Sequence, residues 1–133
     1  MDPGRARELF AAARVARLAT VRPDGSPRLV PVTFAVRGDL VVTAVDHKPK
    51  TTTALRRLTD IEARPRVCLL ADHYDDGDWT RLWWARADGH ARVAHDGAPE
   101  TEWLAEKYPQ YRDHPPRGPA VLITVDHWSG WPG

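Results

Sequence analysis

The feature that most constrains the fold is a succession of short runs rich in β-branched and aromatic residues, separated by turns rather than by long helices. Residues 17–22 and 27–36 flank a Pro-Asp-Gly-Ser turn at 23–26, which predicts a hairpin. The almost wholly apolar run 40–45 has the length of a strand buried on both faces. Consecutive hairpins favour an antiparallel barrel over a doubly wound α/β sheet.

Further strands and three short helices are expected along the rest of the chain. The expected strands cover residues 66–71, 81–87, 90–95 and 120–125, with Gly89 as a turn between the second and third. The expected helices run from the Asp2 N-cap to about Ala16, over 54–58 and over 99–107, and a loop covers 111–119. These patterns predict one mainly β domain over residues 1–133, a barrel of six to seven antiparallel strands.

The charge balance and the absence of targeting segments limit the function classes. Lys plus Arg number 19 against 18 for Asp plus Glu, so the chain lacks the broad positive field that non-specific nucleic-acid binding requires. No apolar stretch approaches the roughly 20 residues that span a bilayer, and the start lacks the apolar core of a signal peptide. We therefore expect a cytoplasmic protein without nucleic-acid or membrane partners.

Motifs for metal binding and nucleophilic catalysis are weak. The lone Cys68 leaves no cysteine pair, and the histidines are scattered without the spacing of a zinc motif. The acidic run 75–78 looks like part of a calcium loop but lacks the rest of the 12-residue pattern. Ser26 belongs to a hairpin turn rather than a nucleophile elbow. We expect no metal and assign no catalytic residue.

The segment after the run 40–45 is a candidate phosphate site. Lysine is scarce in this chain, yet Lys48 and Lys50 lie two residues apart, immediately before Thr51 and an expected helix. Backbone N–H groups at a helix start attract anions, and Lys and Thr add charge and a hydroxyl donor. The alternative interpretation is a solvated loop with two lysines, because such loops lack the specificity of a glycine-rich P-loop.

Tryptophan is unusually frequent, with six in 133 residues. Strand alternation places Trp83 and Trp84 on opposite faces, where packing in the core or in a dimer is the simplest role. Trp128 and Trp131 lie in a tail where no further strand is expected, so we predict that this tail folds over a groove and contacts a ligand or a second subunit. So much aromatic surface on a small barrel also predicts a homodimer.

Taken together, these segments resemble the pyridoxamine 5′-phosphate oxidase-like superfamily of split β-barrels. The resemblance covers nearly the whole chain, and within the superfamily it is nearest to the actinobacterial branch that depends on the deazaflavin coenzyme F420. It rests on the order and spacing of the segments 15–25, 30–34, 43–50, 81–93 and 128–131.

The resemblance implies a homodimer with two coenzyme sites between the subunits. The strand at 30–34 would line the ring, the loop with Thr43 and the two lysines would meet the phosphate, and tryptophans would flank or cap the ring. Pro49 separates the lysines where flavin mononucleotide (FMN) oxidases usually carry an Arg-Lys pair, which favours F420 over FMN. The residues expected to bind the coenzyme are Val30, Pro31, Val32, Thr33, Thr43, Lys48, Lys50, Thr51, Arg56, Trp79, Trp128 and Trp131.

The function implied is an oxidoreductase that transfers a hydride between the deazaflavin and a planar or conjugated organic substrate, with the hard chemistry supplied by the coenzyme. The polyglutamate tail of F420 would need basic surface, which Arg56, Arg57, Arg64 and Arg66 would provide. Two alternatives stay open at this point: an FMN-dependent oxidase or reductase of the same fold, and a non-catalytic protein that binds a coenzyme or tetrapyrrole. Pyridoxamine phosphate oxidation is disfavoured because the expected substrate-binding Arg and His are missing near the end.

Overall fold

The computed structural model describes residues 1–45 and 52–132, in which seven strands form one antiparallel sheet. The order across the sheet is β2-β1-β5-β6-β7-β4-β3. This architecture confirms the prediction of a mainly β fold with six to seven antiparallel strands. The strands are β1 (Ala16–Val21), β2 (Pro27–Val32), β3 (Ala35–Arg37), β4 (Leu40–Ala44), β5 (Arg66–His73), β6 (Trp83–Ala94) and β7 (Ala120–Pro132).

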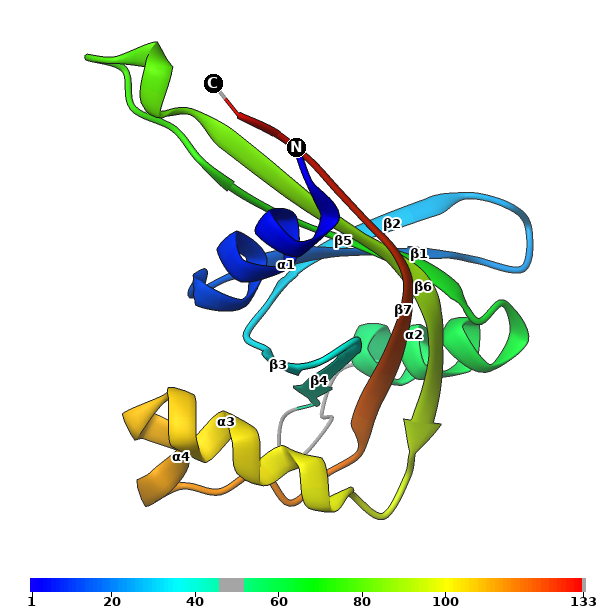
Figure 1. The fold of residues 1–133 in the computed structure, drawn as a ribbon. Coiled ribbons are helices and arrows are strands. Elements are labelled where there is room, and N and C mark those ends of the chain that lie inside the picture. Colours follow the sequence, from blue (N-terminus) through cyan, green and yellow to red (C-terminus); the bar gives the residue numbers. More distant parts are fainter. Residues whose placement is uncertain (46–51, 133) are drawn as a thin grey trace.

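The connection between β2 and β3 closes the sheet into a split barrel. These two strands lie at opposite edges of the sheet, yet only Thr33 and Phe34 separate them in the chain. Because a strand residue spans about 3.3 Å, the two edges must lie within roughly 10 Å of each other at this point. The sheet therefore curls round until its edges meet, as Figure 1 shows.

Helices cover the openings and one outer face of the barrel. They are α1 (Pro3–Ala12), α2 (Thr52–Ala63), α3 (Glu102–Lys107) and α4 (Pro109–Asp113), with 3₁₀ turns at Trp79–Arg81 and Pro99–Thr101. Asp2 caps α1 by accepting from the Arg5 N–H at 3.2 Å, as expected. α1 ends at Ala12 instead of near Ala16, because strand β1 already begins there. The segment expected as a loop from residue 111 instead starts inside α4.

The helices pack against different parts of the sheet. α1 contacts β6 and β7, α2 contacts β1 and β6, and α3 contacts β3 and β4. No helix in the described ranges is long and apolar enough to cross a membrane.

Strand β4 is buried on both faces, as its apolar run predicts. Val41 points into the barrel, where Phe10 lies with its ring centroid 4.7 Å from that of Phe34. Val42 points outward and packs with Leu104 of α3 in a second hydrophobic cluster. The crossover corner is therefore held between the main core and the α3 layer.

Gly89 does not turn the chain, so the prediction of two strands over 81–87 and 90–95 is wrong. Residues 83–94 form the single strand β6, and Gly89 lies at a register shift against β7. A Cβ at this position would lie 2.1 Å from the Thr124 carbonyl oxygen. Glycine is required here for the close backbone approach at a β-bulge rather than for a turn.

The prediction that the tail folds over a groove is also wrong, because β7 continues to Pro132. Gly89 pairs with Val125 and Asp88 with His127, so Asp126 is an extra residue in β7. One extra residue reverses which side chains face inward beyond it. Trp128 consequently faces the core with 7% exposure, whereas Trp131 faces outward with 49% exposure.

Candidate functional site

A cavity of about 310 Å³ lies beside the connection between β2 and β3, and we call it the corner cavity. Its volume is within the range of pockets that hold small organic ligands. It brings together four residues predicted to contact the coenzyme, namely Pro31, Val32, Thr33 and Thr43. The full lining is Pro31, Val32, Thr33, Thr43, Ala44, Val45, Arg57, Tyr111 and Pro116.

Hydrogen bonds fix the walls of the corner cavity. The buried Thr43 hydroxyl donates to the Thr33 carbonyl oxygen at 2.7 Å. The Thr33 hydroxyl shares a 2.8 Å hydrogen bond with the Tyr111 hydroxyl of α4. Tyr108 accepts from the Phe34 N–H at 3.2 Å and donates to the Arg14 carbonyl oxygen at 2.9 Å. These hydrogen bonds tie the connection between β2 and β3 to β4, to the end of α1 and to the segment 108–111.

Lys107, the last residue of α3, joins this helix by hydrogen bonds to the C-terminal end of α1 next to the corner cavity. Its ammonium donates to the carbonyl oxygens of Ala11 and Ala13 at 3.0 and 2.6 Å, and lies 3.8 Å from the centre of the Phe34 ring. These carbonyls are left unpaired by the end of the helix, where a cation is favourable. Burial, and to a lesser degree the charge of Arg14, lower the pKa of Lys107 to about 8.

Arg57 supplies the positive charge at the corner cavity. It is half-buried, and this burial lowers the pKa of its guanidinium. Within the described ranges it forms no ion pair or hydrogen bond. A partly desolvated cation without a carboxylate partner is suited to binding an anionic ligand group.

A second cavity of about 230 Å³ lies between α2 and the β1–β2 hairpin, and we call it the arginine cavity. It contains Val30 and Arg56 from the predicted site, and Arg57 lines both cavities. Its lining is Thr20, Arg22, Arg28, Leu29, Val30, Arg56, Arg57 and Asp60.

Only part of the basic surface expected for a coenzyme tail faces this cavity. Arg56 and Arg57 line it. The Arg64 guanidinium instead donates to the Pro23 carbonyl oxygen at 2.9 Å, and Arg66 lies 3.9 Å from the Asp126 carboxylate. Arg64 and Arg66 do not line the cavity. Arg22 and Arg28 of the β1–β2 hairpin, which were not expected there, line it together with Arg56 and Arg57.

The tryptophans predicted to contact the coenzyme do not line either cavity in this chain. Trp128 is a core residue whose ring packs edge-on against Phe10, and its indole N–H donates to Asp39 Oδ1 at 2.9 Å. Trp79 and Trp131 are exposed on the arm that β5, β6 and the end of β7 project from the barrel (Figure 1). Lys48, Lys50 and Thr51 lie outside the described residues.

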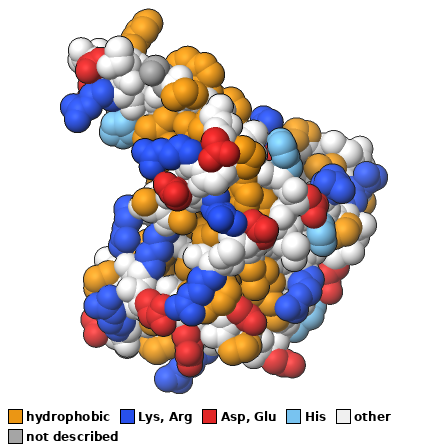
Figure 2. Space-filling view, in the orientation of Figure 1, with side chains coloured by type: hydrophobic (Ala, Val, Ile, Leu, Met, Phe, Trp, Pro, Cys, Tyr) orange, Lys and Arg blue, Asp and Glu red, His pale blue; other side chains and the backbone are white. Residues whose placement is uncertain are grey.

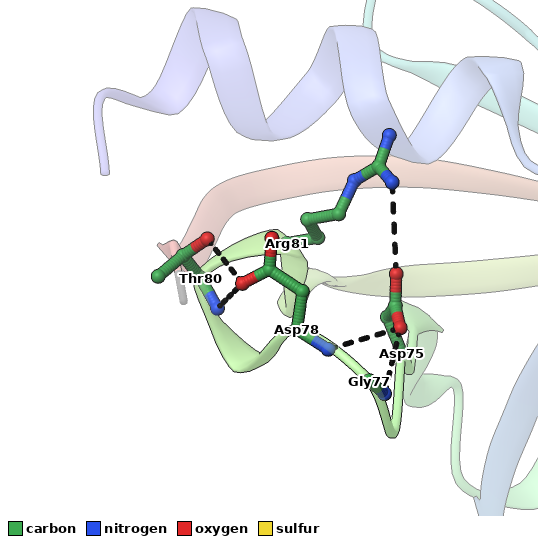
Figure 3. A network of polar contacts seen from close by, with 5 residues as sticks. All are labelled: Asp75, Gly77, Asp78, Thr80 and Arg81. Carbon is green, nitrogen blue, oxygen red and sulfur yellow. Dashed lines mark hydrogen bonds and ion pairs between the residues drawn. The ribbon is translucent and has the colours of Figure 1, made fainter.

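The acidic loop at the tip of the arm satisfies its own charges (Figure 3). Asp75 Oδ1 accepts from the N–H groups of Gly77 and Asp78 at 2.9 and 3.1 Å. Asp78 Oδ1 accepts from the hydroxyl and N–H of Thr80, which lowers the pKa of this carboxyl. Arg81 lies 3.8 Å from Asp75. The carboxylates of this loop therefore order the turn that carries Trp79.

Several cavity residues were not among those predicted from the sequence. Tyr111 and Pro116 belong to a segment that the sequence indicates only as a loop, and the chain brings it to the corner through the packing of α3. Thr20 and Asp60 carry no local motif. Their spacing in the sequence gives no signal, because the cavity joins segments that are distant in the chain.

The fold and the cavities define a class: split β-barrels with a ligand-sized cavity where the sheet closes. Within this class the chain belongs to the pyridoxamine 5′-phosphate oxidase family, whose model matches residues 3–132. This result confirms the superfamily that the sequence resembles. No curated protein matches the chain.

Solved structures share this fold at low sequence identity. A conserved hypothetical protein, Rv2991 from Mycobacterium tuberculosis, superposes with a TM-score of 0.74 at 20% identity, covering 99% of this chain and 85% of its own. An FAD-binding protein from Mesorhizobium loti gives 0.71 at 20% identity, covering 98% and 92%. The FAD-binding protein from Mycobacterium smegmatis gives 0.65 at 17% identity, covering 98% and 94%. At these identities the likeness shows the fold alone.

Proposed function

We propose that this protein is an oxidoreductase that uses coenzyme F420 to transfer a hydride to or from a planar or conjugated organic substrate. The observation that carries the proposal is the corner cavity, in which Arg57 has no ion-pair partner among the described residues. Membership of the pyridoxamine 5′-phosphate oxidase family, and structural neighbours whose names state FAD binding, support a flavin-type coenzyme.

The residues at the corner fit a planar ring that carries polar atoms on its rim. Residues 31–32 end β2, which is an edge strand, so backbone groups on its free side have no partner strand. Such groups can hydrogen-bond to a heterocycle, while the side chains of Pro31, Val32 and Val45 supply apolar contact surface. Tyr111 and Pro116 line the cavity from the α4 side.

The positive groups fit the phosphate and tail of the coenzyme. Arg57, where the two cavities meet, would hold an anionic group, and Arg56 lies on the side of the arginine cavity. The bound deazaflavin itself supplies the hydride chemistry. F420 is preferred to FMN because Lys48-Pro49-Lys50 departs from the Arg-Lys pair usual for FMN and because the cationic surface continues beyond one phosphate.

We further propose that the protein acts as a homodimer with the coenzyme at the seam. The strand registers place the exposed Leu29, Leu70 and Trp131 on the same outer face of the sheet, and Trp84 lies beside Trp131 on that face. Figure 2 shows hydrophobic side chains gathered along the projecting arm. A second copy that packs on this face would remove this apolar surface from water.

Binding of F420 and FMN, followed by quenching of tryptophan fluorescence, tests the coenzyme proposal. We expect F420 to bind at micromolar concentration and Arg57→Gln and Lys50→Ala each to weaken binding about tenfold, with the exposed Arg92→Gln as the matched control. Tighter binding of FMN would assign the FMN alternative. Binding of F420 without oxidation of its reduced form by any acceptor in a panel of planar substrates would indicate a binding protein.

A further inference from the structure

The outer face of strands β2, β1, β5 and β6 is not covered by α1 or α2, and we call it the open face. The buried side chains of these helices, such as Phe10 and Ile61, lie in the main core with Leu69 on the opposite face of the sheet. Because side chains alternate along β5, Leu70 lies on the open face. Together with the exposed Leu29, it gives this face apolar side chains that a second protein surface can cover.

The two ends of the open face carry opposite charges. The arm tip, residues 72–81, contains four aspartates and one arginine. The other end consists of residues 22–28 of the β1–β2 hairpin and the adjacent residues 64–66, and it contains four arginines and one aspartate. These two segments lie together because the Arg64 guanidinium donates to the Pro23 carbonyl oxygen at 2.9 Å. We call the two regions the acidic end and the basic end, and Figure 1 shows the arm and the hairpin projecting in different directions.

The two ends lie at similar distances from the middle of the open face. Leu70 of β5 pairs with Arg17 of the antiparallel strand β1. Asp75 follows Leu70 by five residues, and Arg22 follows Arg17 by five residues in the opposite direction. At about 3.3 Å per residue, each charged group lies roughly 16 Å from this pair. The acidic end of one copy can therefore reach the basic end of another when the centres of their open faces meet.

Symmetry allows two such arrangements. Two copies that pack face to face are related by a two-fold axis that lies in the plane between them. An axis along the strands places acidic end on acidic end and basic end on basic end. An axis across the strands places each acidic end on the basic end of the other copy, so that the favourable contact occurs twice. Like charges brought together across an interface oppose association, so the charges select the second arrangement.

We propose that two copies of this chain pack their open faces with antiparallel strands, so that the arm tip of each lies on the basic end of the other. This inference rests on the homodimer proposed above and goes beyond it by assigning the orientation and the contacts. Tyr74 and Trp79 of the arm are 61% and 68% exposed, and the hairpin offers them the exposed Leu29. Because this hairpin also lines the arginine cavity, the arm of one subunit borders the arginine cavity of the other.

The sign of the salt dependence tests the orientation, with the dissociation constant of the dimer measured by analytical ultracentrifugation. We expect this constant to rise about tenfold between about 50 and 500 mM NaCl, because salt screens the attraction between the acidic and basic ends. In the parallel arrangement salt would screen repulsion, and the dimer would become tighter.

Charge reversal tests the contact itself. Asp76→Lys and Arg22→Glu should each weaken the dimer about tenfold, because each substitution changes both copies of the contact. The two substitutions together should restore the dissociation constant to within about threefold of the wild-type value, since they exchange the charges. Asp113→Lys on α4 is the matched control, because Asp113 is exposed outside the open face, and it should leave the dimer unchanged.

A distance between spin labels gives an independent measurement. A label on Asp76→Cys, in a Cys68→Ser background, lies six residues beyond Leu70, or about 20 Å from the middle of the open face. Electron paramagnetic resonance should therefore find the two labels of a dimer about 40 Å apart along the strands, whereas the parallel arrangement would bring them side by side.

Three results would overturn the orientation and leave the homodimer standing: labels closer than about 20 Å, a dimer that salt tightens, or charge reversals that have no effect. A monomer at about 100 μM would refute both the homodimer and this inference. A dimer that meets all the expectations above and binds neither F420 nor FMN would support the antiparallel arrangement and refute the coenzyme proposal.

Discussion

The corner of the barrel and the projecting arm belong to the same sheet but differ in whether their charged side chains have partners. On the arm, the carboxylates of Asp75 and Asp78 are used by nearby N–H groups, and Arg86 pairs with Asp88 at 3.1 Å. At the corner cavity and in the neighbouring arginine cavity, Arg57 is half-buried and Asp60 is 7% exposed, and neither forms an ion pair among the described residues. Buried charges are costly unless they are paired. The unpaired charges therefore support the ligand site proposed above, and the exposed aromatic side chains of the arm support the proposed dimer surface.

The largest expected effect is a difference in the free energy of unfolding between substitutions of Trp128, at the base of the arm, and Trp131, at its end. Trp128→Ala should lower the free energy of unfolding by about 3–5 kcal/mol, because it empties a buried site against Phe10 and leaves Asp39 without the indole donor. Trp131→Ala, at 49% exposure, should cost less than about 1 kcal/mol in the monomer. Urea denaturation measures both, and equal losses would contradict the bulge that directs the two rings to opposite sides.

The next largest effect concerns the bulge itself. Gly89→Ala should cost about 1–3 kcal/mol, because the added methyl would lie 2.1 Å from the Thr124 carbonyl oxygen and the backbone of β7 must shift. Gly77→Ala on the arm is the control, since its Cβ would lie 3.5 Å from Asp75 Oδ1 in ordinary contact. Thermal denaturation of the two variants compares them, and a Gly89→Ala protein as stable as the wild type would show that the bulge tolerates a side chain.

A third prediction tests directly whether the corner, and not the arm, binds anions. Arg57→Gln should weaken binding of the phosphate-bearing coenzyme by about tenfold, or about 1.4 kcal/mol, without lowering stability, because Arg57 has no partner to lose in the described structure. Arg81→Gln on the arm should leave binding unchanged. Titrations at two salt concentrations measure this, and a similar loss in both variants would locate the anion elsewhere.

The smallest expected effect is a pH dependence at the corner. The pKa of Lys107 is about 8 in the folded protein against 10.5 in the unfolded chain, so the unfolded state binds more protons between these values. The free energy of unfolding should therefore rise with pH above 8, by on the order of 1 kcal/mol by pH 9.5. The raised pKa of Tyr108 opposes this trend only above pH 10.

Lys107→Met isolates that contribution. The difference in unfolding free energy between wild type and variant should change with pH over this window. The raised pKa of Cys68 is common to both proteins and cancels in the difference. A difference that is constant from pH 7 to 9.5 would show that the Lys107 ammonium is solvated in the folded state.

Much of the fold was predictable because its signals are local. The Asp2 cap, the turn at 23–26 and the apolar run of β4 each depend on a few consecutive residues, and the structure has all three. The boundaries of β6 and β7 were not predictable. A glycine signals a turn and a bulge equally well, and only the partner strand distinguishes them.

The candidate site also contains residues that the sequence indicated and residues that only the tertiary contacts revealed. The order of the sequence segments, through the family resemblance that it carries, pointed to Pro31, Val32, Thr33 and Thr43, and all four line the corner cavity. Their contact with a coenzyme stays a prediction. Only the tertiary structure decided that Tyr111 and Arg57 join them, that Asp60 lines the arginine cavity, and that Trp128 lies in the core instead. The physical reason is that a cavity is made by elements distant in the chain, and that one extra residue at Asp126 reverses the faces of everything beyond it.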